Sequence, residues 1–249
     1  DILRFHAVYW PAFLLAADLP PPKRVYGHGW ILSGDEKMSK SKGNILDPLK
    51  IVNEYGVDPL RYYLLKEVSF GNDGNISQEK LENCINSDLA NNYGNLCQRV
   101  IAFNEKNCGL VVPEKDKFEK EDLLLLNKIG DSADSLRSYI DNQELNLYTN
   151  FIVECLFAAN KYFNDQEPWK KKSQVKRLNT IVYVSLEAIR KISILLNPII
   201  PETSLKVLGV FKLSQDNLKF ESIKNHEDLN PNDKIKKIEI LFKKIENND

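Results

Sequence analysis

The chain has 249 residues and a formal net charge of −1, with 34 lysine and arginine residues against 35 aspartate and glutamate residues. Its 43% hydrophobic content is sufficient for one large or two ordinary domains with packed cores. The balanced charge excludes a protein that binds nucleic acid through overall positive charge, so any such contact requires a local cluster of basic side chains.

The sequence further predicts a cytoplasmic protein. No run of 18 or more apolar residues occurs, and the first residues lack the features of a signal peptide, so we expect neither a membrane span nor export. Widely spaced cysteines predict reduced, mostly buried thiols and no metal site: Cys84, Cys97, Cys108 and Cys155. Because the chain begins with Asp1 and its single methionine is Met38, we expect that a segment has been removed upstream.

The first elements predict α/β organisation. Residues 1–17 are apolar almost all round, which predicts a helix buried against a sheet, with a kink at Pro11. Residues 24–32 are a short β-rich run around two glycines and predict a buried strand and the turn that leaves it.

The stretch "SGDEKMSKSKGN", residues 33–44, predicts an exposed loop because it lacks apolar periodicity and has a glycine near each end. Clustered ammonium and hydroxyl groups on such a loop suit a polyphosphate ligand. From composition alone, a lysine-rich surface turn is the simpler interpretation of the stretch.

Two helix starts with the same signature follow the loop. Asp47 and Asp58 each precede a proline, which predicts N-caps for helices at 48–55 and 59–67. The turn-rich residues 70–75 then predict the boundary between a domain at 1–72 and a second at 73–249.

The second domain is predicted to be a helical bundle, because its apolar residues recur with helical period in four stretches between Leu81 and Leu196. Near the C-terminus, residues 218–223 alternate as in a short strand. Asp233 is expected to open a last amphipathic helix that packs back on the bundle.

The sequence "KMSKS", residues 37–41, resembles the signature loop of class I aminoacyl-tRNA synthetases. "DILRFHAVYWPAFL" before "HGW" is similar to the methionyl-tRNA synthetase family, and the similarity continues through "VDPLRYYLLKEVSFGNDGNIS", "NSDLANNYGNLCQRV", "EPW" and "LFKKIE". The resemblance implies a mainly α chain: the C-terminal remnant of a Rossmann-type α/β catalytic domain, followed by an α-helical anticodon-binding domain. The family's H-x-G-H motif and zinc-bearing insertion would lie upstream of Asp1, so no zinc is expected here.

The resemblance also implies roles for individual residues. Lys40, supported by Lys37, would stabilise the charge that develops on ATP, since phosphoryl chemistry needs positioned positive charge. The implied ATP contacts are Lys40, Met38, Ser39, Ser41 and His28. The implied methionine contacts are Ile2, Phe5, His6 and Trp10. The implied readers of the CAU anticodon are Asn95, Arg99, Pro168 and Trp169.

Spacing supports some of these roles, and each has a structural alternative. Ile2 and His6 are one helical turn apart, so they can meet one ligand, although a histidine inside a core helix would show the same spacing. For His28, packing and adenine contact remain equally open. Asn95 and Arg99 share one shoulder of a helix, beside the apolar stripe. Trp169 precedes Lys170–Lys172 and predicts a stacking platform, unless it caps the bundle core.

The resemblance implies a methionine–tRNA ligase that uses methionine, ATP with Mg²⁺ and tRNA(Met). Two alternatives remain at this point: a non-catalytic tRNA-binding module, and a class I synthetase for another amino acid. Since the extra C-terminal dimerisation domain of some family members is missing, a monomer is expected.

Overall fold

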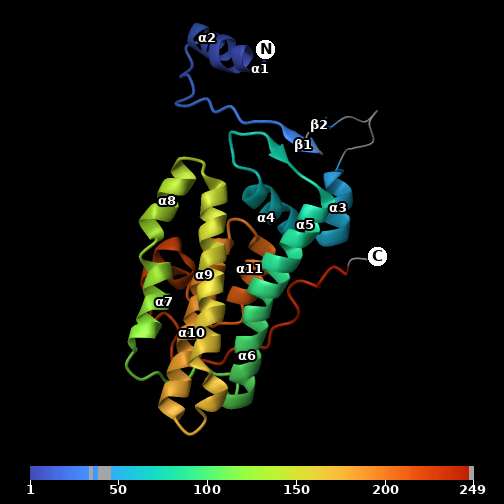
Figure 1. Ribbon diagram of the computed structural model, residues 1–249. Helices are drawn as coiled ribbons and strands as arrows, with labels where there is room; N and C mark the ends of the chain where they lie inside the picture. Colours follow the sequence, from blue (N-terminus) through green and yellow to red (C-terminus); the bar gives the residue numbers. More distant parts are fainter. Residues whose placement is uncertain (34–35, 39–45, 247–249) are drawn as a thin grey trace.

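The computed structural model describes residues 1–33, 36–38 and 46–246 and is mainly helical (Figure 1). Its N-terminal part contains a helix interrupted by a π-helical segment, a three-stranded sheet and two short helices. These elements are α1 (Ile2–Arg4), η1 (Phe5–Tyr9), α2 (Trp10–Ala16), β1 (Ile31–Ser33), β2 (Glu36–Lys37), α3 (Pro48–Tyr55), α4 (Val57–Glu67) and β3 (Gly74–Asn75).

The helix predicted at 1–17 is present, but the prediction that it is buried is wrong. No residue of α1, η1 or α2 is buried, and Phe13 is 71% exposed. In Figure 1 this helix stands apart from the bundle, so no described element covers its apolar face. The π-helical turn η1 ends at Tyr9, two residues before Pro11, and the Trp10 N–H bonds to the Phe5 carbonyl.

The sheet has the order β2-β1-β3, with β1 antiparallel to β2 and parallel to β3. Of the strand predicted at 24–32, only the last two residues lie in β1. The partner β3 has two residues, and the pairing continues to the Trp30 carbonyl, which accepts from the Gly74 N–H at 2.8 Å. Because β3 lies beyond residue 72 and pairs with β1, the sheet joins both sides of the predicted domain boundary, which stays a prediction.

The two Asp-Pro signatures have different outcomes. Asp47 caps α3 as predicted, since its carboxylate accepts from the Leu49 N–H at 2.9 Å. The prediction that Asp58 is an N-cap is wrong, because Gly56 takes that position with a φ of 94°. Asp58 is buried inside the first turn of α4, where its Oδ2 accepts from the Thr203 N–H at 2.7 Å. Asp58 thus joins α4 to a distant part of the chain.

The predicted helical bundle is confirmed. Its elements are α5 (Gln78–Cys84), the π-helical η3 (Ile85–Gly94), α6 (Asn95–Cys108), α7 (Lys120–Gly130), α8 (Ala133–Asp141), α9 (Leu145–Gln166), the 3₁₀ turn η4 (Pro168–Lys170), α10 (Val175–Leu196) and α11 (Pro201–Leu208). Helix α10 is central: every residue from Thr180 to Leu196 is buried, and α6, α7, α9 and α11 pack around it. No helix in the described ranges is both long and apolar enough to cross a bilayer.

Both predictions for the C-terminal region are wrong. Residues 218–223 are not a strand: apart from Lys219 they lie in two 3₁₀ turns, η5 (Asp216–Leu218) and η6 (Phe220–Lys224). The segment after Asp233 is extended and not helical, because its backbone bonds to other segments: the Ile235 N–H donates to Leu110 O at 2.9 Å and the Lys236 N–H to Val210 O at 3.0 Å. The segment still packs back on the bundle as expected, and its apolar side chains are at least half-buried at Ile235, Ile238, Leu241, Phe242 and Ile245.

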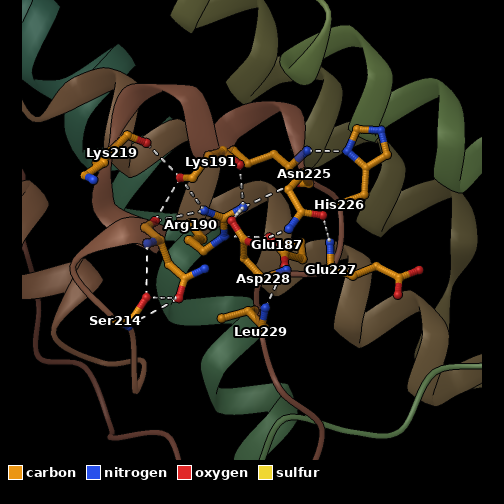
Figure 2. Close-up of polar contacts among 12 residues, drawn as sticks. Glu187, Arg190, Lys191, Ser214, Lys219, Asn225, His226, Glu227, Asp228 and Leu229 are labelled. Atoms are coloured by element: carbon orange, nitrogen blue, oxygen red, sulfur yellow. Dashed lines mark hydrogen bonds and ion pairs between the residues drawn. The ribbon is translucent and has the colours of Figure 1, made fainter.

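A cluster of charged side chains lies inside the bundle on α10 (Figure 2). Glu187 Oε2 accepts from Arg190 Nε at 2.7 Å, while Glu187 Oε1 accepts from the backbone N–H groups of Asp228 and Leu229 at 2.6 and 2.8 Å. Arg190 also pairs with the Asp228 carboxylate at 3.1 Å. Since buried charges are tolerated only when paired and hydrogen-bonded, this cluster fixes the loop at 225–229 against α10.

Candidate functional site

The helix α6 and the turn η4 bring two of the predicted anticodon residues to one aromatic ring, that of Phe163 on α9. The guanidinium carbon of Arg99 lies 5.6 Å from the centre of this ring. The Trp169 ring lies 6.1 Å from it in an edge-on arrangement at 69°. Arg99 and Trp169 therefore both lie against the Phe163 ring, although they are far apart in the sequence.

Local sequence explains how α6 presents its polar side chains. The buried stripe of α6 includes Leu96 and Val100, so Asn95 and Arg99 lie at its edge, where Asn95 is exposed and Arg99 half-buried. The Arg99 Nη2 donates to Asn164 Oδ1 at 2.5 Å. The Asn164 amide and the Phe163 ring thus hold the Arg99 guanidinium, and some of its N–H groups face solvent.

The turn after α9 presents Trp169. Glu167 adopts the left-handed region with a φ of 43° and ends α9, after which Pro168 begins the 3₁₀ turn. Pro168 is buried, so it contributes to the shape of the turn, while Trp169 is 41% exposed. Trp169 packs one edge on the bundle and retains open ring surface, which is what base stacking requires.

The three lysines after Trp169 are less available than their sequence suggests. Lys170 pairs with Glu167 at 2.7 Å, and the Lys171 Nζ donates to the Gln166 carbonyl at 2.7 Å. Lys172 is exposed and makes no ion pair with another described residue. The positive charge near Trp169 that is not already paired therefore comes mainly from Lys172 and Arg99.

The predicted methionine contacts share one exposed helical surface. Phe5, His6 and Trp10 line a hollow, and the rings of His6 and Trp10 meet edge-on at 6.5 Å. The His6 Nδ1 donates to the Ile2 carbonyl at 2.8 Å, so in the neutral ring Nε2 is an acceptor exposed to solvent. His6 is therefore not enclosed in a core within this chain, and its ring can meet a ligand.

His28 lies against an aromatic pair on the segment that leads to β1. Its ring centre is 5.6 Å from that of Phe70, which stacks on Tyr26 at 5.3 Å. The backbone approaches closely here, because a Cβ added to Gly29 would lie 2.2 Å from a backbone atom of Asn72. The glycine after His28 thus serves close packing, and the choice between packing and adenine contact for His28 stays open.

The predicted phosphate loop is only partly described. Lys37 lies in β2, where its backbone pairs with that of Leu32. The Met38 side chain is half-buried against the hydrophobic core. Ser39, Lys40 and Ser41 lie outside the described residues, so their predicted roles are untested. Among the described residues, no group of three histidine, cysteine or acidic side chains could hold a metal ion.

Sequence reasoning missed two residues of the site, Phe163 and Asn164. Phe163 follows Tyr162 in the apolar stripe of α9 and was indistinguishable from a core residue; it is indeed buried, and it also meets the Phe103 ring edge-on at 5.8 Å. Asn164 carries no motif. Only its position one helical turn before Pro168 could have pointed to the site.

Two family models match the chain. One, described as class I tRNA synthetases (M), matches residues 1–101. The other, described as the anticodon-binding domain of methionyl tRNA ligase, matches residues 112–249, more than half of the chain. Both agree with the resemblance drawn from the sequence motifs.

Curated relatives and solved structures point to the same family. The methionine–tRNA ligase of Brucella suis is 43% identical over 224 residues, which are 90% of this chain and 44% of the relative. That of Mycobacterium leprae is 42% identical over 228 residues, 90% of this chain and 42% of the relative. The chain thus spans less than half the length of these relatives.

A solved structure, the Mycobacterium tuberculosis methionyl-tRNA synthetase in complex with methionyl-adenylate, superposes with a TM-score of 0.91 and 38% identity, covering 97% of this chain and 48% of that chain. The motifs, the two family models and this close structural match agree throughout the chain. The chain belongs to the methionine–tRNA ligase family of class I aminoacyl-tRNA synthetases.

Proposed function

We propose that these residues serve the methionine–tRNA ligase reaction. In its first step the carboxylate of methionine attacks the α-phosphate of ATP, which forms methionyl-adenylate and releases pyrophosphate. In its second step the methionyl group passes to tRNA(Met). The proposal draws on the family and on the arrangement of two groups of side chains at opposite ends of the folded molecule (Figure 1).

At the catalytic end, the residues of 37–41 are proposed to neutralise ATP. Lys40 acts on the phosphates and Lys37 supports it, with Met38, Ser39 and Ser41 as further contacts of the loop. Mg²⁺ accompanies the nucleotide. His28 is proposed to lie near the adenine, on the segment that packs on Phe70.

Methionine is proposed to bind at the helix formed by α1, η1 and α2. The hollow lined by Phe5, His6 and Trp10 offers apolar surface for the side chain of methionine, and Ile2 lies one turn before His6. The thioether is a weak acceptor, so the shape of the pocket and a few polar groups decide selectivity.

Anticodon recognition is proposed for the other end, and one observation carries it: Arg99 and Trp169 both lie against Phe163 and keep exposed polar and aromatic surface. Single-stranded RNA is recognised by stacking of splayed bases on aromatic rings and by hydrogen bonds to their edges. Trp169 supplies the stacking surface, and Asn95 and Arg99 supply the hydrogen bonds to the base edges.

The test uses RNA hairpins with a seven-nucleotide loop. The 249-residue chain should bind a hairpin that presents CAU at least tenfold more tightly than one that presents UAC on the same stem. Equal affinities would refute anticodon recognition by this chain, because phosphate contacts alone carry no sequence information.

The reaction is tested in the complete ligase by charging tRNA(Met) with each amino acid in turn. Methionine is the expected substrate, and charging with leucine or isoleucine would favour the alternative synthetase, which the named relatives do not support. In ATP–pyrophosphate exchange the 249-residue chain by itself is expected to be inactive, acting as a tRNA-binding module. We also propose that the protein is a monomer and is located in the cytoplasm. Size-exclusion chromatography with light scattering tests whether it is a monomer.

A further inference from the structure

Beneath the Trp169 turn, a buried ion pair joins α7 to α10. Arg177 Nη1 donates to Asp122 Oδ2 at 2.6 Å, and Arg177 Nη2 donates to Asp122 Oδ1 at 2.9 Å. The Asp122 side chain is completely buried and that of Arg177 is 12% exposed. Two parallel, charge-assisted hydrogen bonds of this kind fix the guanidinium in both position and orientation.

Asp122 is itself held in place, so it is a firm support for Arg177. The Tyr162 hydroxyl donates to Asp122 Oδ1 at 2.5 Å, and the Glu119 N–H donates to Asp122 Oδ2 at 2.8 Å as part of the capping box of α7. Burial, together with the hydrogen bond to Asp122, raises the pKa of Tyr162 well above its usual range, so the phenol stays a donor. The carboxylate therefore has little freedom to move.

A third contact extends this support to the turn. Arg177 Nη2 also donates to the side-chain Oε1 of Gln166 at 2.7 Å. Gln166 is the last residue of α9, and its carbonyl accepts from Lys171 Nζ at 2.7 Å, so two residues that follow the turn both bond to the residue that precedes it. Trp169 lies inside the span closed by these two contacts.

The turn needs such support because its backbone is unusual. Glu167 adopts a φ of 43°, which is costly for a residue with a side chain and persists only where the surroundings enforce it. Short bonds within the turn, from the N–H of Lys170 to Glu167 O at 2.9 Å and from the N–H of Lys171 to Pro168 O at 3.1 Å, do not reach the bundle. Gln166 provides a side-chain connection from the turn to the buried ion pair.

We propose that Arg177 is a positioning residue for anticodon recognition: through Gln166 it holds the turn so that Trp169 is presented beside Phe163 before RNA arrives. The inference rests on the proposed anticodon function and adds a residue that does not touch RNA. Its effect is preorganisation, since an already ordered aromatic ring loses less conformational freedom on binding.

The decisive variant is Gln166→Ala, because it cuts the connection to the turn and leaves the Arg177–Asp122 pair intact. Arg177→Lys is the second variant: its single ammonium retains the charge but cannot bond to Asp122 twice and to Gln166 at once. Removing the arginine altogether would leave Asp122 buried without compensation and is avoided for that reason. Arg137→Met, which removes an exposed guanidinium paired with Glu221, is the matched control.

The first measurement needs no RNA. In the 249-residue chain with Trp10→Phe and Trp30→Phe, Trp169 is the remaining tryptophan, and its fluorescence anisotropy reports how firmly the ring is held. Gln166→Ala and Arg177→Lys should lower the anisotropy and increase acrylamide quenching, while circular dichroism stays unchanged. Unaltered anisotropy and quenching in Gln166→Ala would overturn the proposal.

The second measurement is the affinity for the CAU hairpin. Both variants should weaken it about fivefold, the cost of ordering one large side chain, and Arg137→Met should not. In a Trp169→Ala background, Gln166→Ala should have no further effect, because the two changes act through the same ring. An undiminished loss in that background would show that Gln166 acts elsewhere and would refute the positioning role. If the unaltered chain did not discriminate CAU, the proposed function would fail, while the anisotropy would still decide whether Arg177 positions Trp169.

Discussion

The side-chain nitrogen of Lys191 lies 2.5 Å from Nδ1 of His226, and the lysine is completely buried (Figure 2). The His226 Nε2 lies 2.7 Å from Asn127 Oδ1, an acceptor, so Nε2 carries the ring proton and Nδ1 accepts from the lysine. Burial lowers the pKa of Lys191 to about 7. Burial and the neighbouring Lys191 also lower the pKa of His226.

This pair predicts that stability rises with pH above neutrality. Between about pH 7 and the ordinary lysine pKa of about 10.4, the unfolded chain binds a proton that the folded chain does not, so the free energy of unfolding increases with pH. From pH 7 to pH 9 the gain from Lys191 is on the order of 2 kcal/mol. Urea unfolding of wild type and Lys191→Met at both pH values measures it, and the variant should lose this rise.

Exposed Lys212 supplies the control, since Lys212→Met should keep the pH dependence of the wild type. The other charged groups around Lys191 are Glu187, Arg190, Asp228 and Asp131. They remain in the variant, so a rise between pH 7 and pH 9 that persists in Lys191→Met would assign the effect to them and contradict the prediction.

Trp169→Ala should weaken binding of the CAU hairpin by roughly 5- to 150-fold, the equivalent of about 1–3 kcal/mol for one stacked base. In the complete ligase, ATP–pyrophosphate exchange should stay unchanged, because the tryptophan lies at the end of the molecule opposite to the proposed catalytic elements (Figure 1). Leu123→Ala, which removes an apolar side chain of similar exposure from α7, should alter neither the affinity nor the exchange rate. Loss of both activities in Trp169→Ala would mean that this residue is structural.

Lys40→Ala in the complete ligase should slow methionyl-adenylate formation at least tenfold, because positioned positive charge stabilises the departing pyrophosphate. Single-turnover kinetics with saturating methionine and ATP measure the rate directly. Lys50→Ala, an exposed lysine on α3, serves as the control and should retain the wild-type rate. A Lys40→Ala enzyme with the wild-type rate would exclude the loop lysine from the chemical step.

Local sequence signals predicted those parts of the fold that local physics decides. The Asp47-Pro48 start of α3 was identified because the cap and the helix are adjacent in the chain. The same signature failed at Asp58, because its carboxylate bonds to Thr203 on α11, a partner that no local pattern reveals. The helical period after Asp233 failed for a related reason: Leu110 and Val210 satisfy that backbone, so the apolar residues pack without a helix.

In the candidate site, too, local features were predicted from the sequence and long-range packing was not. Helical spacing predicted that Asn95 and Arg99 share a face of α6. It could not predict that Arg99 and Trp169 both lie against the Phe163 ring, since this depends on the packing of α6 against α9. The apolar composition of the N-terminal helix predicted that it is buried, but its side chains are exposed in the described chain. Composition shows that a helix is apolar, but it does not show which element packs against it.

The Arg99→Lys variant distinguishes base recognition by the guanidinium from electrostatic attraction to the RNA. Lysine keeps the positive charge, but it loses the planar fork that lies over Phe163 and bonds to Asn164 at 2.5 Å. The affinity for the CAU hairpin should fall about tenfold and the preference over the UAC hairpin should largely disappear, while the salt dependence of binding stays that of the wild type. Arg99→Gln should additionally flatten the salt dependence, because it removes the charge. Titrations of both hairpins at several KCl concentrations measure both properties, and an intact preference for CAU in Arg99→Lys would show that the guanidinium contributes charge alone.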